Sequence, residues 1–147
     1  MKQKDFNSNI IQRVLKTAKE VRLCSDYQFF KMGAVLFTNK KVLVAASNEN
    51  KTNPLQKSYD RYRNFEVDMS KGCVHAEMNA LIKLKRLYPN VKPEDVAIMV
   101  YRETHNQHCA LAKPCPACEK ALRDYGITSV YYTGNDSLCY ENYLLNK

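Results

Sequence analysis

Two short stretches of the chain, near residue 75 and near residue 115, carry its most constraining pattern. The first contains His75 and Glu77, two residues apart, and the second reads Pro-Cys-Pro-Ala-Cys, with its cysteines at Cys115 and Cys118. Imidazole nitrogen and cysteine thiolate are ligands that zinc prefers, and a catalytic zinc site uses three protein ligands and leaves a fourth position open. We therefore expect the two stretches to meet in the folded chain around one metal ion.

Both stretches also have the pattern of a helix start. Apolar residues recur at helical spacing over 75–87, and a second short helix is expected to begin near Cys118 and to end at Gly126. Prolines flank Cys115, and the first turn of a helix tolerates proline because its N–H groups lack partners there. The partial positive charge of a helix N-terminus favours the thiolate form of cysteine.

The His-x-Glu and Pro-Cys-x-x-Cys pair resembles the zinc-dependent cytidine and deoxycytidylate deaminase superfamily. This resemblance implies a hydrolytic deaminase whose zinc is held by His75, Cys115 and Cys118. Zinc lowers the pKa of its water to about 7, so that hydroxide attacks the base at neutral pH. Glu77 is implied to take the water proton and to deliver protons to the ring nitrogen and the leaving amine.

The order of apolar runs predicts an α/β protein. We expect a first helix over about 9–24 and strands at 33–37, 42–46, 96–101, 127–132 and 138–144. The last two strands leave no room for a crossover helix, so they should be antiparallel. Together with the resemblance, this predicts the three-layer α/β/α cytidine deaminase-like fold, with a mixed five-stranded sheet whose last two strands are antiparallel. That arrangement resembles the free-nucleoside enzymes.

Composition predicts one globular domain. The 147 residues are 45% apolar and 26% charged, which is enough for a real core, and we expect a single zinc-dependent deaminase domain over 1–147. The first residues lack a signal-peptide pattern and no apolar run reaches the length of a membrane span, so we expect a cytoplasmic protein without a membrane partner. In a reducing compartment, the cysteines outside the Cys-x-x-Cys pair are expected to be free thiols.

Three further positions are candidates for substrate binding because of the resemblance. Asn48 follows Gly33 at the spacing at which cytidine and tRNA adenosine deaminases carry a sugar-binding asparagine. Phe30 stands where small cytidine deaminases have an aromatic residue near the base pocket, although core packing is an equal alternative. The backbone at Ala76 is expected to meet the edge of the base. The same spacing leaves Glu49 without a role.

Two segments suggest other activities. The connection over 49–74 interleaves tyrosine and arginine around Arg61 and Arg63, a pattern that stacks on and clamps single-stranded nucleic acid, although we favour a lid with a short helix there. His105 and His108, with a neighbouring cysteine, would suit a second metal, but we favour a polar loop facing the pocket.

These features favour conversion of cytosine to uracil in a free nucleoside or nucleotide, with cytidine, deoxycytidine or a monophosphate as the small-molecule substrate. The net charge of +8 keeps a deaminase of cytosine in single-stranded nucleic acid as an alternative. A second alternative is a non-catalytic zinc-stapled module that binds nucleic acid. Glu77 favours the enzyme, since a purely structural site has no use for it. The resemblance also implies a homo-oligomer.

Overall fold

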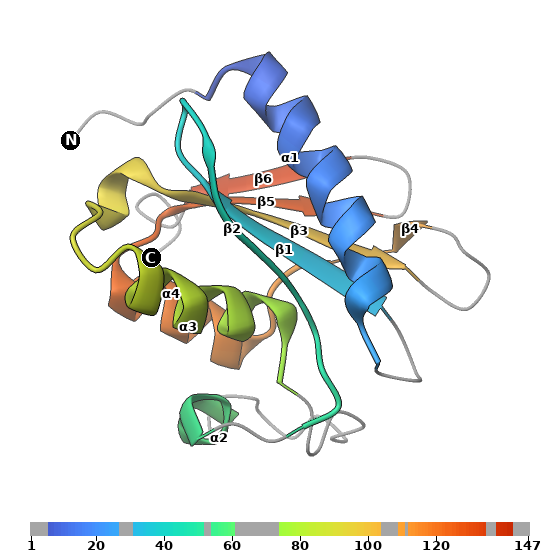
Figure 1. Cartoon of the computed structure of the whole chain (residues 1–147), viewed down its shortest axis with the longest axis vertical. Coiled ribbons are helices and arrows are strands. Elements are labelled where there is room, and N and C mark those ends of the chain that lie inside the picture. Colours follow the sequence, from blue (N-terminus) through green and yellow to red (C-terminus); the bar gives the residue numbers. More distant parts are fainter. Residues whose placement is uncertain are drawn as a thin grey trace.

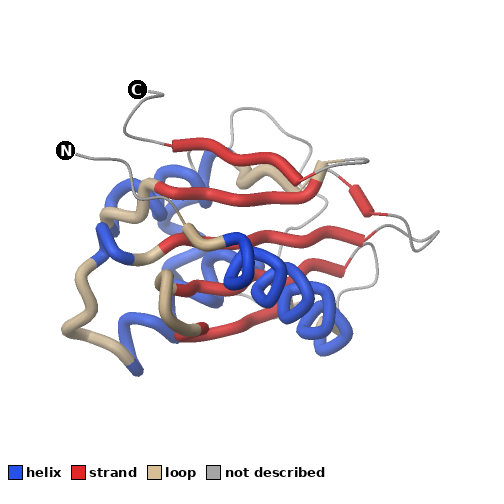
Figure 2. Tube along the Cα trace, turned by 90° about the horizontal axis from the view of Figure 1, so that it is seen from above, coloured by secondary structure: helices blue, strands red, loops and turns tan. Residues whose placement is uncertain are grey.

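The computed structural model describes residues 6–26, 31–51, 54–60, 74–103, 109–110, 112–134 and 138–142. In this part of the chain, helices lie on both faces of a mixed sheet (Figures 1 and 2). The strands are β1 (Lys31–Phe37), β2 (Val42–Ser47), β3 (Ala97–Glu103), β4 (Cys109–Ala110), β5 (Ser129–Thr133) and β6 (Leu138–Asn142). The helices are α1 (Ser8–Val21), α2 (Pro54–Asp60), α3 (Ala76–Leu87) and α4 (Pro116–Tyr125), with 3₁₀ turns η1 (Arg22–Cys24) and η2 (Pro93–Asp95).

The sheet confirms the predicted α/β fold. Its strands follow the order β2-β1-β3-β5-β6, in which β1 is antiparallel to both neighbours and β3 is parallel to β5. The last two strands, β5 and β6, are antiparallel as expected. The short strand β4 was not expected: it pairs its two residues with Arg102 and Glu103, at a place where the sequence predicts a polar loop. Two residues are too few to show the alternation that identifies a strand.

Helix α1 forms where the sequence predicts it, although its last turn tightens. The side chain of Asn7 caps the helix by accepting the Asn9 N–H at 2.8 Å. The α-helix ends at Val21, and the expected remainder up to Cys24 is the 3₁₀ turn η1. Gly33 permits close packing, because a Cβ there would clash with the carbonyl oxygen of Ala18.

Two apolar cores fill the two sides of the sheet. The α1-side core consists of Ile10, Ile11, Val14, Ala18, Val35, Phe37, Ala97, Met99 and Tyr101. The α3-side core is larger and includes Leu36, Met78, Leu81, Leu84, Ile98 and Leu122. Strand β3 contributes to both, because successive side chains of a strand point to opposite faces.

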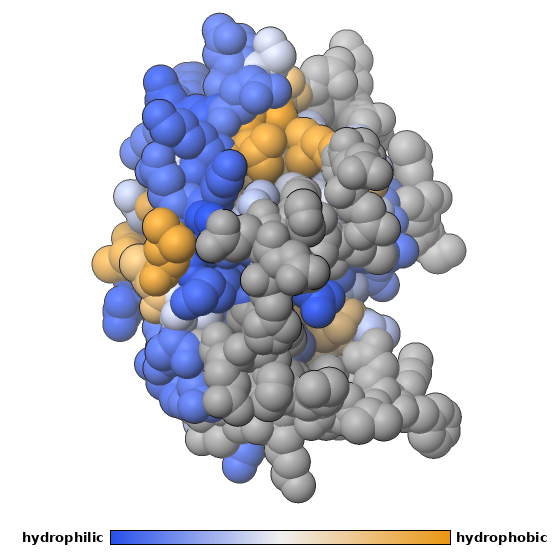
Figure 3. All heavy atoms as spheres, turned by 90° about the vertical axis from the view of Figure 1, so that its right-hand side faces the viewer, coloured by the Kyte–Doolittle hydropathy of each residue, from blue (hydrophilic) through white to orange (hydrophobic). Residues whose placement is uncertain are grey.

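The surface that Figure 3 displays is mainly hydrophilic where residues are described, and its apolar residues form small separate patches. Large apolar side chains that are exposed include Leu23, Leu87, Leu138 and Tyr140. Within the described ranges, no helix has the length and apolar character needed to cross a membrane.

Candidate metal centre

The first residues of α3 and α4 carry the predicted metal ligands. His75 is the N-cap residue of α3, and Cys115 is the N-cap residue of α4. Cys118 is buried in the first turn of α4. Pro116 opens that helix as expected, and Gly126 ends it with a φ of 107°, a left-handed conformation that glycine adopts without strain.

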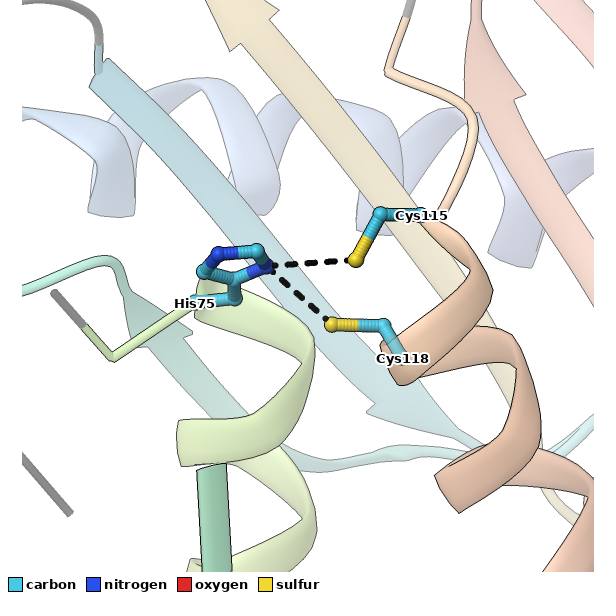
Figure 4. A group of neighbouring side chains, drawn as sticks. All are labelled: His75, Cys115 and Cys118. Carbon is cyan, nitrogen blue, oxygen red and sulfur yellow. Dashed lines mark hydrogen bonds between the residues drawn. The ribbon is translucent and has the colours of Figure 1, made fainter. Parts of the chain in front are cut away.

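The three side chains converge on one point (Figure 4). The Nδ1 atom of His75 lies 3.6 Å from Sγ of Cys115 and 3.3 Å from Sγ of Cys118. All three donor atoms lie within 4.8 Å of one another. Metal–ligand bonds of about 2.0–2.3 Å in a tetrahedron separate the ligand atoms by roughly 3.3–3.8 Å. The spacing of the donor atoms therefore fits three ligands of one zinc ion.

The side chains around Cys115 favour its thiolate form. The thiol of Cys118, followed by the imidazole of His75, stabilises the Cys115 thiolate and lowers the pKa of Cys115 to about 4 against the opposing effect of burial. The thiolate is the form of cysteine that binds metals.

Glu77 stands next to this ligand set and does not belong to it. Its side chain is 2% exposed, and its Oε1 atom has no hydrogen-bond partner among the described residues. Burial raises the pKa of Glu77. A buried carboxylate oxygen without a hydrogen-bond partner is unfavourable, and groups whose pKa is shifted by burial cluster at functional sites, so Glu77 is a candidate functional residue.

The segment that carries Asn48 pairs with the residue that directly precedes the metal ligand His75. Glu49 and Val74 exchange two backbone hydrogen bonds of 3.0 Å, and Val74 directly precedes His75. Asn48 is fully buried, and its Oδ1 atom accepts the backbone N–H of Met32 at 3.0 Å. The predicted sugar-binding asparagine and the metal ligands are thus brought to one region of the molecule.

Two further polar residues of this region, Asn79 and Gln56, carry no signal in the sequence that identifies them. The amide nitrogen of Asn79 donates to the carbonyl oxygen of Ser47 at 3.0 Å and to Oε1 of Glu49 at 3.2 Å. Gln56 accepts the backbone N–H of His75 at 3.0 Å. Neither residue belongs to a recognisable spacing. The only hint is that Asn79 lies four positions after His75, on the same side of a predicted helix.

The other candidates divide into two groups. Ala76 is fully buried and is the first residue of α3. Phe30, His105, His108, Arg61 and Arg63 lie outside the described residues. The expected short helix of the 49–74 connection is present as α2.

The sequence matches the family model of the cytidine and deoxycytidylate deaminase zinc-binding region over residues 5–134. The chain belongs to this family. No curated protein sequence matched it significantly.

Solved structures of similar fold include three deaminases. A cytidine deaminase from Burkholderia pseudomallei has 25% identity and a TM-score of 0.60, with 90% of this chain and 91% of that one covered. A dCMP deaminase from the cyanophage S-TIM5, in complex with dCMP and dUMP, has 23% identity and a TM-score of 0.57, with coverage of 87% and 83%. A cytidine deaminase from Mycobacterium leprae has 19% identity and a TM-score of 0.56, with coverage of 97% and 100%.

The family match and the three converging ligands confirm the prediction of a zinc-dependent deaminase. His75, Cys115 and Cys118 form the site that suits the zinc ion.

Proposed function

We propose that residues 1–147 form one domain that converts cytosine to uracil in a free nucleoside or nucleotide. The observation that carries the proposal is the buried Glu77 carboxylate, whose Oε1 atom lacks a partner among the described residues beside the three zinc ligands. Membership of the cytidine and deoxycytidylate deaminase family supports cytosine as the base. The similar structure from Burkholderia pseudomallei, named a cytidine deaminase, agrees with this choice.

In this proposal, the chain's main chemical task is to move protons. Zinc bound by His75, Cys115 and Cys118 supplies Lewis acidity that makes water nucleophilic at neutral pH. Glu77 accepts a proton from the water and passes protons to the ring nitrogen and to the departing ammonia. Water is consumed and ammonia is released, so the amino group of cytosine is replaced by the carbonyl oxygen of uracil.

Asn48 is proposed to bind a sugar hydroxyl. Its Oδ1 atom accepts the Met32 N–H, which ties this side chain to strand β1. The first backbone N–H groups of a helix have no partner within the helix, so those near Ala76 suit the edge of the base. Stacking of Phe30 on the base stays a prediction from the sequence.

The proposal is tested by following deamination of cytidine, deoxycytidine, their monophosphates, adenosine and a cytosine-containing oligonucleotide, at low and moderate salt. We expect reaction of the free nucleosides or nucleotides with little salt dependence. Affinity for a single strand would fall with salt: a plot of the logarithm of the binding constant against the logarithm of the salt concentration has a slope of about −0.7 per phosphate contact. A reaction confined to the oligonucleotide, with a rate that collapses in salt, would make nucleic acid the substrate. Deamination of adenosine alone would reject cytosine.

The role of Asn48 is separable from its structural bond with Met32. Asn48→Asp keeps an oxygen that accepts the Met32 N–H but removes the amide donor, whereas Asn48→Ala removes both. Free cytosine has no sugar and serves as the internal control. We expect both variants to lower kcat/KM for the nucleoside more than for cytosine, without loss of zinc. An unchanged ratio between the two substrates would reject the sugar contact.

Self-association and a cytoplasmic location stay predictions from the sequence.

A further inference from the structure

Helix α3 begins without a side-chain cap of its own. Its N-cap residue is His75, whose imidazole is turned toward the two cysteines and makes no cap hydrogen bond. In many helices the third residue is Glu or Gln, and its side chain returns to accept the N–H of the N-cap residue. The third residue of α3 is Met78, which is buried and apolar. The backbone N–H of the metal ligand therefore needs an acceptor from elsewhere.

Gln56 of helix α2 supplies that acceptor. Its Oε1 atom accepts the His75 N–H at 3.0 Å, although 19 positions separate the two residues in sequence. The Gln56 side chain is 2% exposed. A buried amide is unfavourable unless it is hydrogen-bonded, so this bond gives the side chain a reason to be inside. A bond that a capping box normally makes within one helix is here made between two helices.

The same short helix is also attached to α4, which carries the two cysteines. The hydroxyl group of Tyr59 donates to Oδ2 of Asp124 at 2.9 Å. Leu55 and Tyr59 pack against the α3-side core. Helix α2 thus contacts both helices that supply zinc ligands, through Gln56 at the start of α3 and through Tyr59 at the last turn of α4.

We propose that Gln56 is a positioning residue of the metal centre. Gln56 acts through His75: it fixes the backbone from which the imidazole reaches the two thiolates. Loss of the bond frees the His75 peptide to rotate and loosens one of the three ligands. The inference depends on the metal centre and not on the choice of substrate.

The test compares three variants by the rate at which a chelator removes zinc. Gln56→Met keeps the length of the side chain but has no oxygen acceptor. Gln56→Glu keeps the acceptor, and its negative charge at a helix N-terminus is favourable. Tyr59→Phe removes the bond to Asp124 and leaves the His75 N–H untouched. Each variant is also measured for melting temperature without metal.

We expect Gln56→Met to release zinc about 10-fold or more faster than the wild type, since loss of a group that orients a metal ligand weakens metal binding about 10–100-fold. Gln56→Glu and Tyr59→Phe should release zinc at close to the wild-type rate. The absorption spectrum of the cobalt-substituted protein should change in Gln56→Met and stay unchanged in the other two. A role in folding alone would lower the melting temperature of the metal-free protein without moving the release rate or the cobalt spectrum.

An unchanged release rate in Gln56→Met would overturn the proposal. So would equally fast release from Gln56→Glu, because that variant retains the acceptor. If Gln56→Met does not fold, Gln56→Glu decides the question: wild-type zinc retention supports the proposal, and rapid release rejects it. None of these measurements uses a substrate, so a failure of the proposed deamination of cytosine would be seen separately.

Discussion

The two faces of the sheet are built for different tasks. On the α1 side, apolar residues of the sheet pack against helix α1. An ion pair between Arg22 and Glu103, 2.7 Å apart, links the turn after α1 to the end of β3. On the other side, polar side chains are buried among the apolar ones; they include Asn48, Gln56, Glu77 and Asn79. Burial of polar groups is unfavourable unless they are hydrogen-bonded, and the polar groups of this side surround the metal ligands. Substitutions on the α1 side should change stability, and those on the α3 side should change activity or metal binding.

The largest effect is expected for Glu77→Gln. The substitution keeps the size of the side chain but removes its ability to accept and deliver a proton. Positioned proton transfer contributes about 10²–10⁴-fold to a rate, and we expect a loss of at least that size in kcat. Zinc content and melting temperature should stay close to those of the wild type, because Glu77 is not among the three metal ligands.

A matched control for Glu77→Gln is His75→Ala, which should lose both zinc and activity. A Glu77→Gln protein with substantial activity would show that another group moves the proton. A Glu77→Gln protein without zinc would place the carboxylate among the metal ligands and would remove the distinction between chemistry and metal binding on this side of the sheet.

The opposite face is tested by Gly33→Ala. The added Cβ would clash with the Ala18 carbonyl oxygen of α1, and backbone atoms cannot yield as a flexible side chain does. We expect the free energy of unfolding to fall by about 1–3 kcal/mol, the range of overpacked sites. Zinc content and kcat at low temperature should be retained. Loss of zinc at unchanged stability would show that the two faces are not independent.

The metal centre could be predicted from the sequence because zinc binding restricts which residue types can serve as ligands. His75, Cys115 and Cys118 must be ligands of the right kind, and each stretch must also begin a helix. The antiparallel end of the sheet was predictable for a similar reason, since the chain after β5 is too short for a crossover.

The polar contacts around that centre could not be predicted in the same way. Gln56 and Asn79 act through hydrogen bonds to residues 19 and 30 or more positions away, and such bonds leave no periodic trace in the sequence. The spacing of Gly33 and Asn48 predicts no substrate contact for Glu49; in the structure its carboxylate accepts a hydrogen bond from Asn79 and pairs with Lys51. The hydrogen bonds of Asn79 form where α3 packs against the end of β2, a contact that the folded structure shows.

Asn79→Ala tests whether this network serves substrate binding. The Asn79 amide bonds to the residues on both sides of Asn48 in the sequence: it donates to the carbonyl oxygen of Ser47 and to the side chain of Glu49. Loss of two hydrogen bonds, worth about 1 kcal/mol each, should loosen this segment. We expect KM for nucleosides to rise roughly tenfold, with a smaller change in kcat and full zinc content. Equal losses for nucleosides and free cytosine would indicate a general structural role instead.

The smallest effect is expected for Glu103→Gln on the α1 side. Arg22 donates to the Glu103 carboxylate at 2.7 Å, and the two side chains are only 12% and 10% exposed. Hydrogen bonding with Arg22 lowers the pKa of Glu103 below its ordinary value of 4.5. A depressed pKa stabilises the fold at pH values above the unfolded-state pKa, and this contribution is lost as the pH falls through the folded-state value. At pH 7 we expect a loss of about 1 kcal/mol, between the values for an exposed ion pair and for a buried charged hydrogen bond.

The difference in unfolding free energy between wild type and Glu103→Gln should therefore be constant near neutral pH and shrink as the solution becomes acidic, measured by urea unfolding of both proteins side by side. Zinc release in acid affects both proteins and cancels in the difference. Deamination at pH 7 should be unchanged, because Glu103 points to the side of the sheet away from α3 and α4. A difference that persists unchanged at low pH would mean that the carboxylate charge contributes nothing. A drop in activity at pH 7 would mean that the α1 side takes part in the function of the metal side.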